Sequence, residues 1–182
     1  MKKNATTPKG RILIWLLIAA LGTGFALGTG IVPMKSTGAR PESSPAALLE
    51  SQAQSNPTDP EPWIELGNYY FDTDQYEKSI QSYEKALAIT PDNPNVITDM
   101  GVMYRRSGNP IRAVDLFDRA IAADPTHEQS RMNKGVVLLN DLKDMPGAVA
   151  AWEGLLEINP FFMVGNDFSL EELVKKYKSQ MP

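Results

Sequence analysis

Apolar side chains between residues 60 and 162 recur at the spacing of helix faces. Through most of this region they follow the i, i+3, i+4, i+7 order that gathers them on one side of an α-helix. No segment alternates apolar and polar residues in the way that predicts a half-buried strand. The pattern therefore predicts an all-α domain built from amphipathic helices.

The helical pattern repeats with a fixed period. Three prolines, each at the end of an apolar run, stand 34 and 35 residues apart: Pro91, Pro125 and Pro160. Three glycines keep the same period upstream: Gly67, Gly101 and Gly135. A period of this length is typical of stacked helical repeats, and the closing proline ends the second helix of each unit. We therefore predict three tandem helix-turn-helix units over residues 60–162, at 60–93, 94–127 and 128–162.

A lead-in helix is expected before the first unit. Residues 33–59 form a proline-rich linker, but 46–54 within it have helical character. They end shortly before Pro57, which stands 34 residues before Pro91 and so keeps the period. A helix here would cover the apolar end of the repeat stack.

A capping helix is expected after the last unit. The segment 163–182 contains Ser169-x-x-Glu172, a capping box that typically starts a helix. The helix should run over 170–179, where lysines in its last turn suit the negative end of the helix dipole. Its expected role is to shield the last repeat from solvent.

Residues 1–40 differ from the rest of the chain in charge and hydropathy. They hold six basic residues and no acidic one, and 12–32 form a run of 21 uncharged positions. At about 1.5 Å per residue, a helix of this length spans about 30 Å, the thickness of a bilayer's hydrocarbon core. We therefore predict a transmembrane helix at 12–32, preceded by a basic cytoplasmic tail at 1–11.

The flanking charges predict the orientation of this helix. Four basic residues precede the apolar run and two follow it, which places the amino terminus in the cytoplasm. The expected product is a single-pass inner membrane protein with its helical domain in the periplasm of a bacterium. The alternative is a signal peptide cleaved near Thr37-Gly38-Ala39, with secretion to the periplasm. Gly24 and Gly28 form a GxxxG pair, which would permit a homo-oligomer.

Composition excludes several kinds of chemistry. The chain has no cysteine, so disulfides, thiolate zinc sites and cysteine nucleophiles are excluded. Residues 41–182 hold 12 basic and 22 acidic residues, which argues against a nucleic-acid partner. The sole histidine, His127, lies in a turn, and Asp72-x-Asp74 lacks the glycine and glutamate of a calcium loop. We predict no enzymatic activity, no metal and no cofactor.

The repeats resemble a known family. The first unit reads Trp63-x-x-Leu66-Gly67-x-x-Tyr70, followed at intervals by Tyr83, Ala86 and Pro91. This order resembles the tetratricopeptide repeat (TPR) family, whose signature is Trp-x2-Leu-Gly-x2-Tyr followed by spaced Ala, Phe, Ala and Pro. The resemblance covers residues 60–162 and implies a curved stack whose inner face is lined by the first helix of each unit.

The resemblance also assigns residues to an inner groove. They are Ile64, Asn68 and Phe71 from the first unit, Thr98, Val102 and Arg105 from the second, and Met132, Val136 and Leu139 from the third. Such a groove implies a protein partner that presents an extended peptide or a helix. For the third unit, packing against the capping helix is the alternative.

The third unit departs from the family pattern. Arg131 stands where the first unit has Trp63, and the turn inside the unit needs one extra residue. Because proline suits the first turn of a helix, the second helix of this unit is expected to begin at Pro146 or Gly147.

Two narrower family resemblances bear on function. Some TPR co-chaperones grip a carboxyl-terminal peptide with lysines and asparagines. Asn68 matches one clamp asparagine, but Ile64 and Asp99 stand where a lysine and a second asparagine are needed, so that clamp is absent. Residues 56–70 resemble the periplasmic TPR parts of bacterial cytochrome c maturation proteins.

Taken together, these features predict a membrane-anchored TPR adaptor that binds a partner protein and assists complex assembly in the bacterial envelope. The alternatives are a self-associating structural scaffold and a cytochrome c maturation-type assembly factor.

Overall fold

The computed structural model describes residues 44–165 and 168–181. This part of the chain consists of helices and one short pair of strands. The elements are α1 (Pro45–Ser55), α2 (Glu61–Asp72), α3 (Tyr76–Ile89), α4 (Pro94–Arg106), α5 (Pro110–Ala123), α6 (Glu128–Asn140), α7 (Met145–Leu156), β1 (Met163–Val164), β2 (Phe168–Ser169) and α8 (Leu170–Lys178). The predicted all-α helical-repeat class is confirmed.

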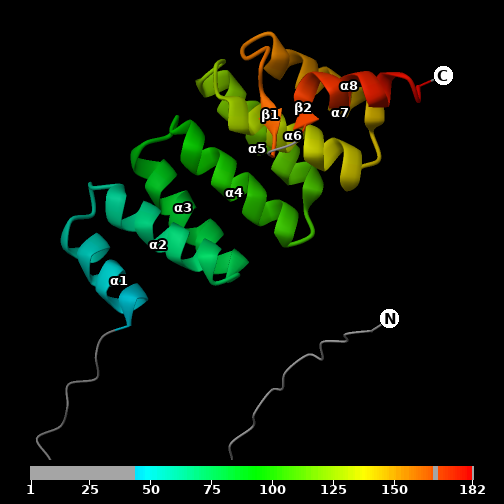
Figure 1. Ribbon diagram of the computed structural model, residues 1–182. Coiled ribbons are helices and arrows are strands. Elements are labelled where there is room, and N and C mark those ends of the chain that lie inside the picture. Colours follow the sequence, from blue (N-terminus) through cyan, green and yellow to red (C-terminus); the bar gives the residue numbers. More distant parts are fainter. Residues whose placement is uncertain (1–43, 166–167, 182) are drawn as a thin grey trace, which may run out of the picture. The chain divides into compact units, whose positions relative to one another are not determined.

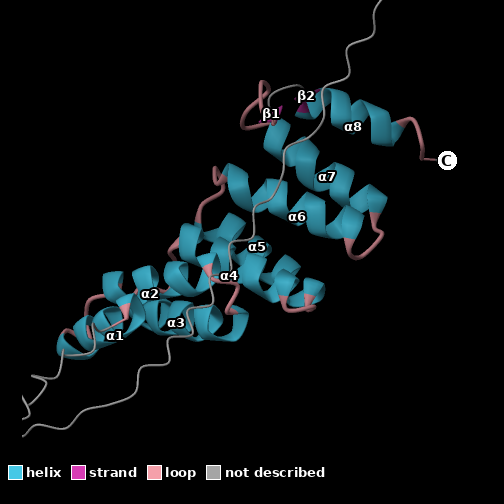
Figure 2. Ribbon diagram, turned by 60° about the horizontal axis from the view of Figure 1, so that its bottom comes forward, coloured by secondary structure: helices cyan, strands magenta, loops and turns pink. Residues whose placement is uncertain are grey.

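The helices are stacked in chain order. Each helix packs on the next, and α2–α3, α4–α5 and α6–α7 are the most closely packed pairs. The first helices of the second and third units also meet, since α4 contacts α6. The loops between helices are short (Figures 1 and 2). This arrangement places α2, α4 and α6 in equivalent positions along the stack.

Side-chain caps explain where several helices begin. Asn93 accepts hydrogen bonds from the backbone N–H groups of residues 95 and 96 at the start of α4, and Pro94 occupies its first turn. Asn109 and Asp144 cap α5 and α7 in the same way. The expected capping box is present at α8, where the side chain of Ser169 accepts from the N–H of Glu172.

The periodic glycines allow the two helices of each unit to approach closely. A Cβ atom built on Gly101 would lie 2.7 Å from Cε1 of Phe117, which is fully buried on α5. A Cβ on Gly67 or Gly135 would collide with the ring of Tyr83 or Trp152, respectively. The glycine and the aromatic ring therefore form a complementary pair in all three units.

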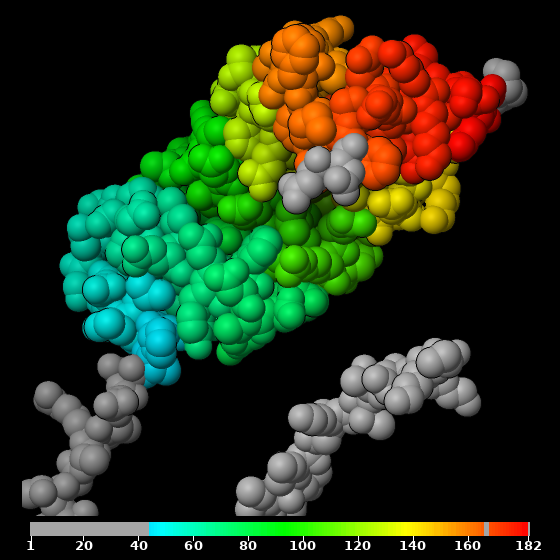
Figure 3. All heavy atoms as spheres, in the orientation of Figure 1, coloured from blue at the N-terminus to red at the C-terminus, as the bar shows by residue number. Residues whose placement is uncertain are grey.

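Helices α1 and α8 lie at the two ends of the described unit (Figure 3). Ala53 of α1 is fully buried, and Glu50 of α1 accepts a 3.2 Å hydrogen bond from the hydroxyl of Tyr70. At the other end, Leu170 and Val174 of α8 belong to the apolar cluster of Trp152. These are the places where the lead-in and capping helices are expected.

Two of the sequence-based predictions were wrong. Met163–Val164 and Phe168–Ser169 form a two-stranded antiparallel pair, although no strand was predicted. The pair is too short to show alternation; it forms where the chain reverses before α8. Helix α7 begins at Met145, one residue before the predicted start, because Asp144 supplies the cap.

The predicted transmembrane helix at 12–32 lies outside the described residues. Within 44–165 and 168–181, no helix combines the length and the hydropathy that crossing a bilayer requires.

Candidate functional site

The nine predicted groove residues occupy three equivalent positions on α2, α4 and α6. The positions lie four and three residues apart, so on each helix they share one face. The rows are Ile64, Thr98 and Met132, then Asn68, Val102 and Val136, then Phe71, Arg105 and Leu139. We call the face that they share the inner face.

The open part of the inner face lies around the first two units. Five residues from α2, α3 and α4 enclose a recess of about 320 Å³: Asn68, Phe71, Asp72, Tyr83 and Asp99. The hydroxyl of Tyr83 donates a 2.8 Å hydrogen bond to Oδ1 of Asn68. We call this space the α2–α4 recess. It includes two of the predicted groove residues, whereas Ile64 is partly buried beside the apolar core of the first two units.

Asp99 is the most perturbed carboxyl group in the recess. It is partly buried, and burial raises its pKa to about 6. Burial also raises the pKa of Tyr83, and the nearby charges of Asp99 and Asp72 act in the same direction. Within the residues that the structure describes, Asp99 has neither a hydrogen bond nor an ion pair. Among these residues, no hydrogen-bond donor or cation therefore stabilises the negative charge of Asp99.

The second unit adds an apolar and a basic side chain beside the recess. Val102 is half-buried against the core. Nε of Arg105 lies 2.7 Å from Oδ2 of Asp141, which joins the end of α4 to the turn after α6. Arg106 pairs with Asp74 at 3.1 Å. Both arginines at the end of α4 therefore already have acidic partners.

Thr98 differs from the expectation for a groove residue. Its side chain is only 1% exposed, and its hydroxyl lies 2.7 Å from that of Ser130 on α6. The Ser130 hydroxyl is 2.6 Å from Nδ1 of His127, whose Nε2 is 3.0 Å from Oδ1 of Asn95. This polar chain joins α4 to α6, so Thr98 and His127 have structural roles.

The predicted groove residues of the third unit are half-buried, as Ile64, Phe71 and Val102 are. Met132, Val136 and Leu139 pack against an apolar cluster that includes Trp152 of α7 and Leu170 and Val174 of α8. We take the α2–α4 recess as the candidate site because predicted groove residues line this hollow.

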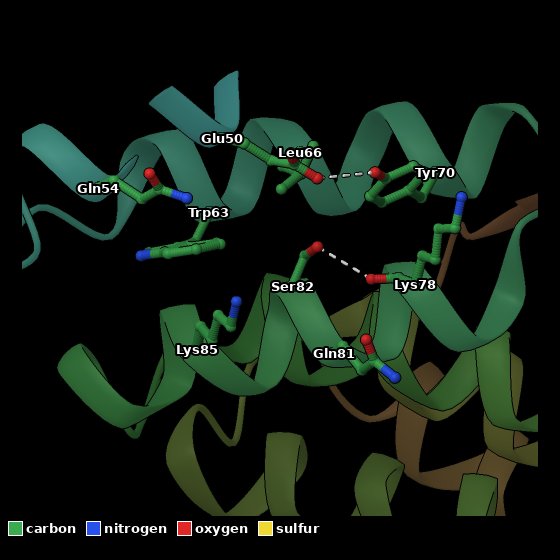
Figure 4. Close-up of a pocket in the computed structure, with 9 residues that line it drawn as sticks. All are labelled: Glu50, Gln54, Trp63, Leu66, Tyr70, Lys78, Gln81, Ser82 and Lys85. Atoms are coloured by element: carbon green, nitrogen blue, oxygen red, sulfur yellow. Dashed lines mark hydrogen bonds between the residues drawn. The ribbon is translucent and has the colours of Figure 1, made fainter. Parts of the chain in front are cut away.

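A second hollow lies on the opposite face of α2. Glu50 and Gln54 of α1, Trp63 and Tyr70 of α2, and Lys85 of α3 line a crevice of about 430 Å³ (Figure 4). The ammonium group of Lys85 lies 4.0 Å from the centre of the Trp63 ring, and Glu50 is bonded to Tyr70. We call it the α1–α3 crevice. Because Glu50 and Lys85 already contact aromatic side chains of the crevice, whereas Asp99 has no such partner within the described residues, the α2–α4 recess is the better candidate site.

Sequence reasoning missed part of the recess. Tyr83 was assigned only to packing, yet its hydroxyl reaches the inner face. Asp72 was considered only as a calcium ligand, and within the described residues no cluster of metal-ligating side chains is present. Asp72 directly follows the predicted groove residue Phe71, and this was the signal in the sequence that could have placed it beside the groove. The equivalent residue of the second unit is Arg106, which has the opposite charge, so the repeats do not share a charge at this position.

Asp99→Asn should stabilise the protein at neutral pH. The folded-state pKa near 6 lies above the ordinary value of 3.8, so stability should fall as pH rises through this window. Removing the charge should therefore raise the free energy of unfolding above pH 6, by about 1–3 kcal/mol. Urea unfolding at pH 4 and pH 7.5, followed by circular dichroism, measures the effect. Glu84→Gln, which removes a charge from an exposed position on α3, is the control. A less stable Asp99→Asn protein at pH 7.5 would contradict this account.

Comparison with known proteins assigns the family. A TPR repeat model matches residues 67–108, and a tetratricopeptide repeat model matches residues 98–161. Anaphase-promoting complex subunit 3 of Schizosaccharomyces pombe is 31% identical over 111 residues, which are 58% of this chain and 16% of that protein. The chain spans only 15–16% of the length of the curated relatives that it matches.

Solved structures share the fold. The structure of MamA protein has a TM-score of 0.62 and 19% identity, over 74% of this chain and 72% of that one. The first TPR domain of Spaghetti (RPAP3), bound to an HSP90 peptide, has a TM-score of 0.57 and 23% identity, over 66% of this chain and 91% of that one. The family models together cover the second half of α2 and helices α3 to α7. The chain belongs to the tetratricopeptide repeat family.

Proposed function

We propose that this protein is a membrane-anchored TPR adaptor whose inner face binds a segment of a partner protein. The observation that carries the proposal is the α2–α4 recess, which combines Asn68, an exposed amide, with half-buried Phe71 and uncompensated Asp99. A surface of this kind offers both apolar contact and hydrogen bonds to an extended chain or helix. The RPAP3 domain, which has the same fold, is bound to a peptide.

The membrane part of the proposal rests on the sequence. The uncharged run at 12–32 and its flanking charges support a single-pass inner membrane protein, with the repeats in the periplasm. Cleavage near residue 39 and release into the periplasm is the alternative. In either case the repeats act in the bacterial envelope, and the role is to help assemble a complex without catalysis or a cofactor.

A self-associating scaffold is the second candidate. Phe161, Met163 and Phe168 are 87%, 51% and 63% exposed near the start of α8, and exposed apolar groups of this size often mark interaction surfaces. The GxxxG pair at Gly24 and Gly28 also favours self-association. A role in cytochrome c maturation rests on the resemblance of residues 56–70 alone.

Capture of partners from membranes tests the adaptor proposal. The full chain should be recovered in the membrane fraction after a carbonate wash, and after detergent extraction it should retain partner proteins. Val102→Glu should lose them, because it places a charge on the half-buried inner face. Ile111→Glu is the matched control, because Ile111 is 66% exposed on α5.

The outcomes separate the candidates. Asn68→Lys repeats the test at an exposed position, without placing a charge among half-buried apolar side chains, and its circular dichroism spectrum checks that loss of the bond from Tyr83 leaves the fold intact. If both inner-face variants keep the same partners as the unmodified protein, the groove is not the binding site. If only further copies of this chain are captured, the scaffold replaces the adaptor.

A further inference from the structure

The α2–α4 recess contains two carboxylates without partners. Asp72 is exposed at the end of α2, and Asp99 is partly buried on α4. Among the residues that the structure describes, neither makes a hydrogen bond through its side chain or an ion pair. A partly buried carboxylate loses hydration that nothing in the recess replaces.

The two arginines beside the recess do not neutralise the carboxylates of Asp72 and Asp99, because both arginines pair with other aspartates. Arg105 lies against Asp141, and Arg106 pairs with Asp74 while its guanidinium lies 4.8 Å from the centre of the Phe71 ring. Each arginine is thus held by a different aspartate. The recess retains a net negative charge, which opposes an acidic peptide and favours a basic one.

The walls of the recess fit a long basic side chain. Phe71, which is half-buried in the wall of the recess, provides apolar surface that can cover the methylene stem of lysine or arginine. The charged end can then reach the carboxylates and the hydroxyl oxygen of Tyr83, which can still accept a hydrogen bond while its O–H donates one to Oδ1 of Asn68. Charge-assisted hydrogen bonds of this kind are the strong ones in protein recognition.

We propose that the α2–α4 recess recognises a lysine or arginine side chain presented by a segment of the partner protein. The proposal deepens the adaptor function and rests on it. It also sets this groove apart from the co-chaperone clamp, because Asp99 stands where that clamp has an asparagine. A free carboxyl terminus of the partner is therefore repelled.

Selection of random peptides on the full chain in detergent tests the proposal. A phage library of random dodecapeptides is the probe, and the best binders are made with a fluorescent label for anisotropy titration. We expect the binders to share a lysine or arginine at one position. Replacing that residue by glutamine should weaken binding about ten- to a hundredfold.

A double-mutant cycle assigns the contact to Asp99. Asp99→Asn should weaken binding of the basic peptide by a similar factor. It should leave the affinity for the glutamine peptide unchanged, because the two substitutions remove the same interaction. Glu84→Gln is the control for general charge and should change neither affinity. If the losses from Asp99→Asn and from the peptide substitution simply multiply, the recess does not hold the basic side chain.

Three other results would overturn the proposal in different ways. Binders that depend on Val102 but carry no basic residue, and ignore Asp99→Asn, would leave the adaptor function standing and remove the inference. Basic peptides that bind only after Lys35 and Arg40 are changed to glutamine would show that the protein's own basic segment occupies the recess. Failure of every peptide to depend on the inner face would remove the adaptor function as well.

Discussion

Trp152→Ala should cause a large loss of stability at the carboxyl-terminal end of the stack. The side chain is only 2% exposed, its indole N–H donates a 3.2 Å hydrogen bond to the carbonyl of Met132, and its ring centre lies 5.9 Å from that of Tyr177. It therefore joins α6, α7 and α8. Truncating a buried tryptophan costs about 3–5 kcal/mol, since a cavity remains. Urea unfolding followed by circular dichroism gives the change in the free energy of unfolding.

We also expect Trp152→Ala to destabilise the carboxyl-terminal end of the stack before the rest. Each unit of a repeat protein contacts only its neighbours, so hydrogen exchange should show lost protection first in α6, α7 and α8. Trp63→Ala is the matched control, because Trp63 is half-buried near the other end of the stack. Its cost should be smaller, about 1–2 kcal/mol. Equal losses for the two tryptophans would contradict the packing described for the third unit.

Gly101→Ala should destabilise the protein even though alanine favours helices. In an exposed helix interior this change gains about 1 kcal/mol. Here the new Cβ would lie 2.7 Å from Cε1 of Phe117, which is fully buried and cannot move away freely. Overpacking of this kind costs about 1–3 kcal/mol. The expected result is therefore a net loss of stability in urea unfolding.

A second substitution tests the cause of that loss. Phe117→Leu removes the ring edge that the new methyl group meets, at the cost of a cavity. In the double variant the two losses should not add, because the cavity accepts the methyl group. Losses that add within about 0.5 kcal/mol would show that the glycine and the ring do not act as a pair.

The fold could be predicted because repetition makes local signals consistent. Three prolines and three glycines with one period locate three helix pairs, and Ser169 with Glu172 locates the start of α8. The paired strands at Met163–Val164 and Phe168–Ser169 could not be predicted. Their pairing depends on how the chain reverses between α7 and α8, which leaves no periodic signal in so few residues.

The site was harder to predict than the fold. Family resemblance assigns the groove residues to one face of each first helix, but the burial of each side chain depends on which side chains meet across helices. Thr98 occupies the same position as Ile64 and Met132, yet it is buried where α4 packs on α6, and Ser130 offers its hydroxyl a partner there. Tyr83 reaches the inner face from α3 through a bond to Asn68. Neither contact follows from helical spacing alone.

Site-specific photo-crosslinking in cells tests most directly the central claim that the inner face binds the partner. A photoreactive phenylalanine is placed at Asn68, which lines the α2–α4 recess, or at Gln81, which lines the α1–α3 crevice (Figure 4). Both positions are exposed, so the protein should fold in either case. The account predicts a crosslinked partner from position 68 and none from position 81. A partner crosslinked from position 81 alone would contradict it.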